Sequence, residues 1–168
     1  DKFIKGDYLC THQGWQSYIV ANEKDPQLFK ADPSIVPLST YLGTVGMPGR
    51  TAYFGLLRVG LPKSGETIVV SAASGAVGTV VGQMGKILGC RVVGVAGGEV
   101  KCSYVKDELG FDDCIDYKAG NLEEDLKNAC PDGIDIYFEN VGGPVSKAVA
   151  KLLNPGSRVP ICGFISAY

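Results

Sequence analysis

Short apolar runs recur along the chain from residue 67 onward. They are five or six residues long, rich in valine and isoleucine, and mostly not interrupted by polar residues at alternate positions. Runs with this pattern are typical of strands that are buried on both faces of a sheet. The predicted strands lie at 67–72, 91–96, 113–117, 134–139 and 158–162.

Stretches with a helical spacing of apolar residues separate these strands. They lie at 76–88, about 99–109, 121–129 and 144–153. A regular alternation of strands and helices predicts an α/β fold with a doubly wound parallel sheet and right-handed crossovers. In the first helix the spacing predicts one face that packs on the sheet, formed by Val77, Val80, Val81, Met84 and Leu88.

The first sixty residues show a different pattern. Residues 7–21 hold two strand-like runs around Gly14, whose aromatic and β-branched residues favour an antiparallel hairpin or meander. Residues 22–37 hold three prolines and little periodicity, which is typical of a linker or a surface crossing. From residue 38 onward the pattern becomes helical, so this segment is predicted to lead into the first strand of the sheet.

The bend after the first strand of the predicted sheet, residues 73–78, reads ASGAVG. This is the dinucleotide-binding pattern GxGxxG with alanine in place of the first glycine. Gly75 would let a diphosphate approach the backbone, Gly78 would let the helix pack on the strand, and free N–H groups at the helix start would bind the phosphates. Small residues also serve packing alone, but the strand before the bend and the helix after it favour a dinucleotide site.

The end of the second strand of the sheet indicates which dinucleotide is bound. An acidic side chain there would hold the 2′-hydroxyl of NAD. The sequence instead has Ala96, Gly97 and Gly98, followed by Lys101. Small residues leave room for the 2′-phosphate of NADP, and a lysine can neutralise it. Glu99 favours the opposite choice, and a solvated helix charge is the alternative for Lys101, but the missing acid favours NADP(H).

Charge and cysteine content exclude several other functions. Sixteen basic and eighteen acidic side chains give a net charge of −2, which offers no general field for nucleic acid or an anionic membrane. No apolar run approaches the roughly 20 residues that span a bilayer. The six cysteines are scattered and His12 is the single histidine. We therefore expect no metal site, reduced thiols and a cytoplasmic protein, with His12 in a structural role.

Five stretches together carry a family resemblance: VGMPGRTAYFGLL, SAASGAVGTVVGQMGK, GCRVVGVAGG, GIDIYFENVGG and RVPICGFISAY. The sequence resembles the zinc-independent medium-chain dehydrogenases/reductases, and within them the prostaglandin reductase, leukotriene hydroxydehydrogenase and alkenal/one oxidoreductase group. The resemblance implies a metal-free enzyme that uses NADPH to reduce the carbon–carbon double bond of α,β-unsaturated aldehydes and ketones. Hydride would pass to the β-carbon, and the full-length protein would be a homodimer.

The resemblance also implies two domains. Residues 1–37 would be a remnant of a GroES-like β-barrel catalytic domain and a linker. Residues 38–168 would be a Rossmann domain that binds NADP and is truncated before its last strand. Because the rest of such an enzyme normally helps to close the active site, we expect activity of the parent enzyme rather than of this stretch alone.

The resemblance assigns cofactor contacts along the carboxyl edge of the predicted sheet. The diphosphate would lie on Gly75, Ala76, Val77 and Gly78, the 2′-phosphate on Lys101, and the adenosine by Tyr117. The loop after the fourth strand would contribute Asn140, Val141 and Gly142. A packing role for Tyr117 and an ordinary Asn/Gly turn after the fourth strand are the alternatives.

The nicotinamide would lie after the fifth strand. The residues assigned there are Cys162, Gly163, Phe164, Ile165, Ser166 and Tyr168, with Met47 and Thr51 flanking the ring from the preceding helix. The alternatives for Met47 and Thr51 are a core methionine and a helix-start threonine.

Tyr168 is the predicted catalytic residue. Hydride delivery to the β-carbon of an enone leaves an enolate, and a hydroxyl that stabilises the enolate or fixes the nicotinamide ribose meets that need without a metal. A packing tyrosine is the alternative. Two other functions stay open, namely an NADPH quinone oxidoreductase of the same superfamily and a non-catalytic NADPH-binding protein.

Overall fold

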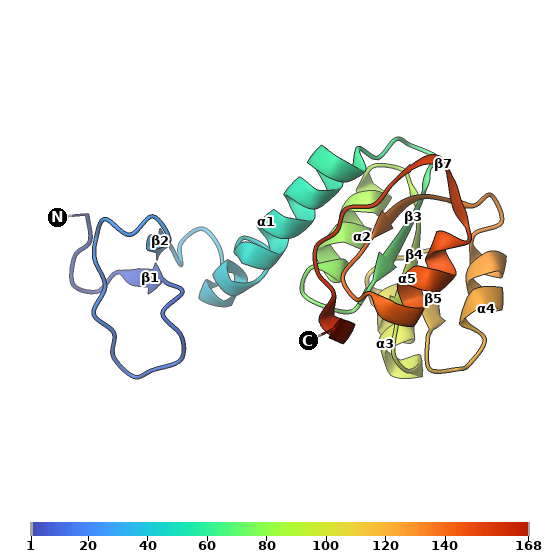
Figure 1. Cartoon of the computed structure of the whole chain (residues 1–168). Helices are drawn as coiled ribbons and strands as arrows, with labels where there is room; N and C mark the ends of the chain where they lie inside the picture. Colours follow the sequence, from blue (N-terminus) through green and yellow to red (C-terminus); the bar gives the residue numbers. More distant parts are fainter. Residues whose placement is uncertain (1, 168) are drawn as a thin grey trace.

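The computed structural model describes residues 2–167, so the predicted catalytic Tyr168 lies outside the described residues. Five strands form one parallel sheet in the order β5-β4-β3-β6-β7 (Figure 1). The doubly wound sheet predicted from the apolar runs is thereby confirmed. The strands are β3 Thr67–Ser71, β4 Arg91–Ala96, β5 Asp113–Asp116, β6 Ile134–Phe138 and β7 Leu153–Arg158.

Helices cover both faces of this sheet, which explains why its central strands are apolar throughout. Along β3, Ile68 packs in one apolar cluster with Val81 of α2, while the next residue, Val69, packs in a second cluster with Leu126 of α4. Alternate residues of a strand point to opposite faces, so the two clusters lie on opposite sides of the sheet. The helices are α2 Gly78–Ile87, α3 Glu99–Ser103 continuing as η3 Tyr104–Glu108, α4 Leu122–Ala129 and α5 Gly143–Ala150.

The inner face of α2 matches the prediction at four of its five positions. Val81 is fully buried, and Val77, Val80 and Met84 pack against the same cluster. Leu88 is 37% exposed, so the prediction for this residue is wrong. The reason is that α2 ends at Ile87, and the chain has already begun to turn toward β4.

The last strand begins earlier than predicted. β7 covers Leu153–Arg158 rather than 158–162, and it pairs with β6 through an irregular register. Beyond β7, an isolated bridge joins Ile161 to Glu139. Pairing beyond β7 is carried by Glu139, whose N–H donates to the Pro160 carbonyl at 2.9 Å and whose carbonyl accepts from the Cys162 N–H at 2.8 Å.

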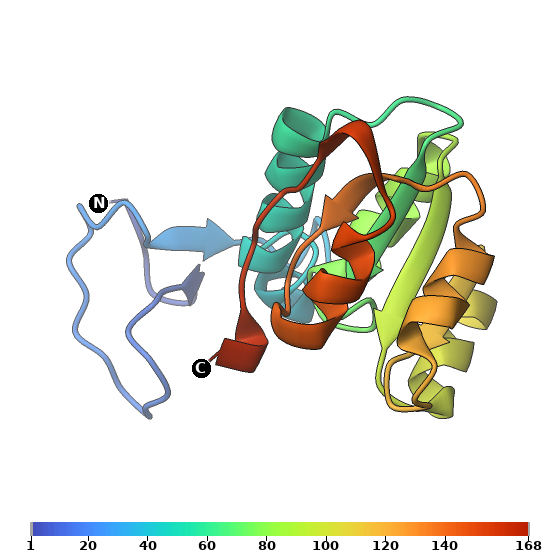
Figure 2. The ribbon, with the colours of Figure 1, turned by 45° about the vertical axis from the view of Figure 1, so that its right-hand side comes forward.

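The N-terminal strands also differ from the prediction. β1 Tyr8–Cys10 pairs in antiparallel fashion with β2 Phe29–Ala31 (Figure 2). The predicted hairpin within 7–21 is therefore wrong, and the predicted linker at 22–37 contains a strand. Trp15, whose type favours a strand, is fully exposed. Aromatic residues stabilise strands where they pack on neighbours, so their presence alone could not locate the pairing.

One long helix links the two-stranded sheet to the five-stranded sheet (Figure 1). After a short turn, η1 Leu38–Leu42, the helix runs as α1 Met47–Phe54 and continues as η2 Gly55–Gly60. Leu56 at its inner side is fully buried in the same cluster as α2. Within residues 2–167, none of the helices has the length and apolar character needed to cross a membrane.

Candidate functional site

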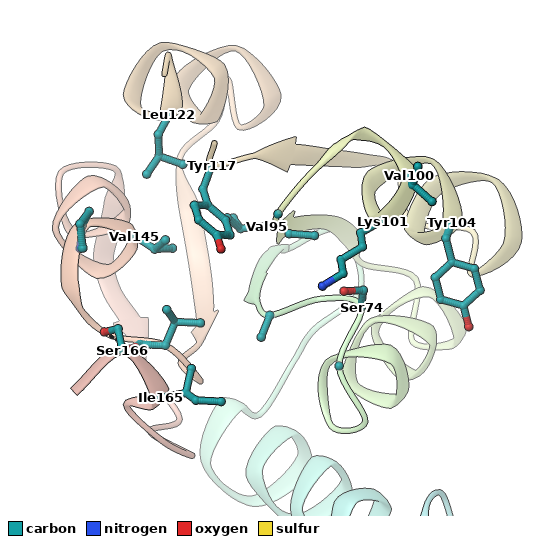
Figure 3. Close-up of a pocket in the computed structure, with 16 residues that line it drawn as sticks. Ser74, Val95, Val100, Lys101, Tyr104, Tyr117, Leu122, Val145, Ile165 and Ser166 are labelled. Atoms are coloured by element: carbon teal, nitrogen blue, oxygen red, sulfur yellow. Dashed lines mark hydrogen bonds between the residues drawn. The ribbon is translucent and has the colours of Figure 1, made fainter. Parts of the chain in front are cut away.

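A cavity of about 910 Å³ lies at the carboxyl ends of the central strands (Figure 3). Its walls come from the bend after β3, the end of β4, the start of α3, and the segments that enter α4 and α5. Ligands of doubly wound sheets bind at this edge. Six predicted site residues line the cavity, namely Gly75, Lys101, Tyr117, Val141, Ile165 and Ser166.

A second group of predicted site residues lies elsewhere. Thr51 and Cys162 line a smaller cavity of about 260 Å³. The Thr51 hydroxyl donates to Met47 Sδ at 3.4 Å, and Met47 itself is exposed. Cys162 is also exposed. The structure therefore groups these three residues with one another and does not bring them into the larger cavity.

The two glycines of the bend after β3 have different surroundings. A Cβ added to Gly78 would lie 2.3 Å from the Ala72 carbonyl oxygen, so the fold itself requires glycine there. A Cβ added to Gly75 would meet the same oxygen at 3.1 Å, and its next neighbour would be the Ala72 Cβ at 3.9 Å. Gly75 therefore has an open side toward the cavity, and packing alone does not explain why this position is glycine. Ala76 and Val77 continue from Gly75 into α2, with Val77 as its N-cap.

The segment between β4 and α3 places Lys101 on the cavity wall. Gly98 is the N-cap of α3, with φ +97°, and its N–H donates to the Asp116 carboxylate at 2.8 Å. That bond and a second from the Lys118 N–H lower the pKa of Asp116. Figure 3 shows the Lys101 side chain directed toward Ser74 across the bend. A cation and a hydroxyl group thus face one another at this end of the cavity.

Tyr117 and Gly97 form one packing unit. A Cβ added to Gly97 would lie 2.8 Å from Cε1 of the Tyr117 ring, so a side chain at that position would displace the ring. Tyr117 itself remains 47% exposed, and its hydroxyl points into the cavity (Figure 3). The residue therefore combines the packing role and the cavity position that the sequence left as alternatives.

Glu139 was not predicted as a site residue, yet it organises the loop after β6. Its Oε1 accepts hydrogen bonds from the backbone N–H groups of Val141, at 2.8 Å, and Gly142, at 2.9 Å. Burial by itself would raise the pKa of Glu139, but hydrogen bonds from Ser146, Gly142, Val141 and Tyr137 outweigh burial and lower it. The side chain is therefore a carboxylate held within the protein.

Asn140 ties the same loop to the neighbouring strand. Its side-chain amide donates to the Ser71 carbonyl at 2.7 Å, and its backbone N–H donates to Ser71 Oγ at 2.8 Å. The side chain thus fastens the end of β6 to the end of β3 and does not line the cavity. The sequence ENVGG, interpreted as a turn, predicted neither the contacts of Asn140 nor the burial of the Glu139 carboxylate.

The last described segment packs on this loop. Ser166 donates to the Val141 carbonyl through both its N–H, at 3.0 Å, and its hydroxyl, at 2.5 Å. A Cβ added to Gly142 would lie 2.9 Å from Cδ1 of Phe164. Gly163 donates its N–H to the Glu139 carbonyl at 3.2 Å. The chain leading toward Tyr168 is therefore attached to the loop after β6.

Several residues on the cavity wall escaped prediction. Tyr104 lies three positions after Lys101, so helical spacing alone could have indicated it. The others follow a strand end or begin a helix, the places where ligand contacts gather in such sheets. These further wall residues include Ala72, Ser74, Val100, Leu122 and Val145.

The side chains that could ligate a metal do not form a metal site among the described residues. All six cysteines are free, and Cys90, Cys102 and Cys130 are buried. Within residues 2–167, no group of three or more His, Cys, Asp or Glu side chains is placed to hold a metal ion.

Comparison with known proteins places this geometry in a family. Residues 76–168 match the family model described as zinc-binding dehydrogenase. The chain is 53% identical to the NADPH-dependent curcumin reductase of Escherichia coli over 99% of its length and 48% of the relative's. It is 52% identical to prostaglandin reductase 1 of Oryctolagus cuniculus over 97% of its length and 47% of the relative's.

A solved structure is also similar to the whole arrangement. CurA from Vibrio vulnificus, in complex with NADPH, matches with a TM-score of 0.90 and 54% identity, over 97% of this chain and 48% of that one. The chain thus spans about half the length of the proteins it matches.

Proposed function

The chain belongs to the zinc-binding dehydrogenase family, and on that premise we propose that it is the cofactor-binding part of an NADPH-dependent reductase. The proposed reaction is reduction of the carbon–carbon double bond of α,β-unsaturated aldehydes and ketones, with hydride transfer to the β-carbon. The observation that carries the proposal is the 910 Å³ cavity, which has Lys101 and the open side of Gly75 on its walls. The names of the similar curcumin and prostaglandin reductases support the substrate class.

The residues present fit NADP(H). The open side of Gly75 admits a diphosphate close to the backbone, and the start of α2, ten residues long, offers it N–H groups and a partial positive charge. Lys101 then neutralises the 2′-phosphate, with the Ser74 hydroxyl facing it (Figure 3). Tyr117 contacts the adenosine, consistent with its hydroxyl pointing into the cavity.

The remaining assignments concern the reacting end of the cofactor. When bound, NADPH supplies the hydride. Val141, Ile165 and Ser166 form a wall that orients the nicotinamide and excludes water from it. Tyr168 follows this wall in the sequence, and we assign its hydroxyl to stabilising the enolate oxygen or fixing the ribose. The described residues do not offer a zinc ligand set, and we derive no step from zinc.

We also propose how the complete protein is organised. Residues 38–168 form the cofactor-binding domain, and residues 1–37 belong to the catalytic domain and its linker. The separate two-stranded sheet formed by β1 and β2 supports this division. The complete protein is proposed to be a cytoplasmic homodimer, and the free state of all six cysteines is consistent with a reducing compartment.

Isotope transfer tests the proposed reaction. The complete protein is incubated with deuterated NADPH and a medium-chain alkenone, and the product is examined by mass spectrometry and NMR. Deuterium is expected at the β-carbon. Deuterium at the carbonyl carbon would identify an alcohol-forming reductase, and faster turnover of a quinone assayed alongside would identify a quinone oxidoreductase. Tight NADPH binding without turnover of either substrate would identify a non-catalytic binding protein.

A further inference from the structure

Glu139 is the most deeply buried charged residue in the described chain, with 2% of its surface exposed. A carboxylate removed from water is costly unless partners compensate its charge. None of the ion pairs within residues 2–167 includes Glu139. Hydrogen-bond donors therefore compensate the charge, and the positions of these donors indicate the role of the residue.

The donors converge on Glu139 from three elements and one turn. Tyr137 of β6 donates its hydroxyl to Oε1 at 2.9 Å, and Ser71 of β3 donates to the same oxygen at 3.2 Å. Ser146 of α5 donates to Oε2. The consecutive N–H groups of Val141 and Gly142 also point at Oε1. One carboxylate oxygen thus fixes the direction of two backbone amides, in a turn where Gly142 has φ +78°.

This turn supports one wall of the cavity. Val141 lines the cavity, and its carbonyl accepts both hydrogen bonds from Ser166, which also lines it. Figure 3 shows Ser166 and Ile165 on the opposite side of the cavity from Lys101. A displacement of the turn would therefore move the cavity wall formed by Val141 and Ser166. The opposite wall, which carries Lys101, would stay in place.

We propose that Glu139 is a positioning residue for the nicotinamide half of the cofactor. It holds the Val141–Gly142 turn, and through the turn Ser166, in the place that this half requires. The inference rests on the proposed function, in which the cavity binds NADPH with its 2′-phosphate at Lys101. Loss of a residue that only stabilised the fold would affect the binding of both halves of the cofactor alike, or of neither, so the two roles can be separated.

The test compares two ligands on the complete protein by calorimetry. NADPH reports on both halves, and 2′,5′-ADP reports on the adenosine half alone. For Glu139→Ala we expect the Kd of NADPH to rise about 10- to 100-fold, because hydrogen bonds to a charged group are lost. The Kd of 2′,5′-ADP is expected to stay within about twofold. Glu139→Gln keeps one acceptor oxygen in place, so it should recover part of the NADPH affinity, to within about 3- to 10-fold of wild type.

Asp135→Ala is the matched control. Asp135 lies at the amino end of β6, the strand that Glu139 follows, and its carboxylate accepts from the Thr67 N–H at 2.9 Å and from the Asn154 amide at 2.8 Å. Its removal should lower thermal stability and leave both Kd values unchanged.

Each outcome of this comparison is decisive. Equal weakening of both ligands in Glu139→Ala, or a response like that of Asp135→Ala, overturns the positioning role. If Glu139→Ala does not fold, Glu139→Gln decides alone, and an NADPH affinity equal to wild type overturns the inference. Failure of the wild-type protein to bind NADPH would instead contradict the proposed function, so the two failures remain distinct.

Discussion

At the scale of single residues, packing explains some of the residues around the cavity and does not explain others. Glycine is required at Gly78 by its close approach to the Ala72 carbonyl, and a side chain at Gly97 would displace the Tyr117 ring. Lys101 is different, because its ammonium group is directed into the cavity toward Ser74 (Figure 3). Lys101 also lines the cavity, and a cation in that position suits the proposed contact with the 2′-phosphate.

Lys101→Ala tests this explanation. We expect NADPH affinity to fall by about 1.5–3 kcal/mol, since a charge-assisted bond to phosphate is lost, while NADH affinity changes little. Titration calorimetry of both cofactors measures the difference. Lys118→Ala is a suitable control, because Lys118 lies over the Tyr117 ring at 5.9 Å and is not part of the cavity wall. Equal losses for NADPH and NADH in Lys101→Ala would remove the assignment to the 2′-phosphate.

At the scale of elements, the bend between β3 and α2 joins two requirements in one short segment. Its second half must let α2 approach the strand, and its first half must leave space for a ligand. Ala72, at the end of β3, has φ +49°, a left-handed conformation that is uncommon for residues other than glycine. Such strained positions gather at ligand sites, and Ala72 lines the cavity.

Valine substitutions at the two glycines of this bend should have opposite effects. Gly75→Val is expected to weaken NADPH binding more than 100-fold, because a branched side chain fills the open side, while the melting temperature changes by no more than about 4 °C. Gly78→Val is expected to destabilise the fold itself, since its Cβ would overlap the Ala72 carbonyl at 2.3 Å. Calorimetry and thermal unfolding measure the two effects. Unchanged NADPH affinity in a folded Gly75→Val protein would mean that the bend serves packing alone.

The elements also mark what the sequence could and could not predict. Apolar runs predicted β3, β4, β5 and β6 because a strand that is buried on both faces needs apolar side chains at successive positions. β7 lies at the edge of the sheet, where its exposed Pro155 and Gly156 are tolerated. Its own sequence is therefore not an apolar run, and the prediction fell on the more apolar segment that follows it. Glu139 left no local signal, because its role depends on donors that the fold brings from β3, β6 and α5.

At the scale of the whole molecule, the motifs predicted the family and the comparisons confirm it. Relatives near 50% identity along nearly the whole chain include prostaglandin reductases and a 2-alkenal reductase, and the family model covers residues 76–168. The motifs identified the family because they cluster at the ligand edge of the sheet. They could not place β1 and β2, whose pairing joins segments far apart in the sequence.

Removal of residues 1–37 tests the division between the two parts. Both apolar clusters are built from residues 52 onward. The contacts that cross the division include a hydrogen bond from the Tyr41 hydroxyl to the Asp32 carbonyl at 3.1 Å and the stacking of Arg50 over Phe29 at 5.6 Å. We expect residues 38–168 to unfold cooperatively, with a melting temperature within about 2–4 °C of the intact chain, as the loss of about 1 kcal/mol would give. Loss of a cooperative transition in calorimetry would show that the division is misplaced.

Two helices, α2 and α5, begin at the same edge of the sheet, and the start of a helix attracts an anion. At α5 the chain supplies that anion itself, because Glu139 occupies the amides of Val141 and Gly142 just before the helix. At α2 the N-cap side chain of Val77 makes no hydrogen bond. A ligand with one diphosphate therefore meets free N–H groups at the start of α2, whereas the amides before α5 already bind the Glu139 carboxylate. The internal carboxylate thus makes the two helix starts unequal, so that a diphosphate is attracted to the start of α2 and not to the start of α5.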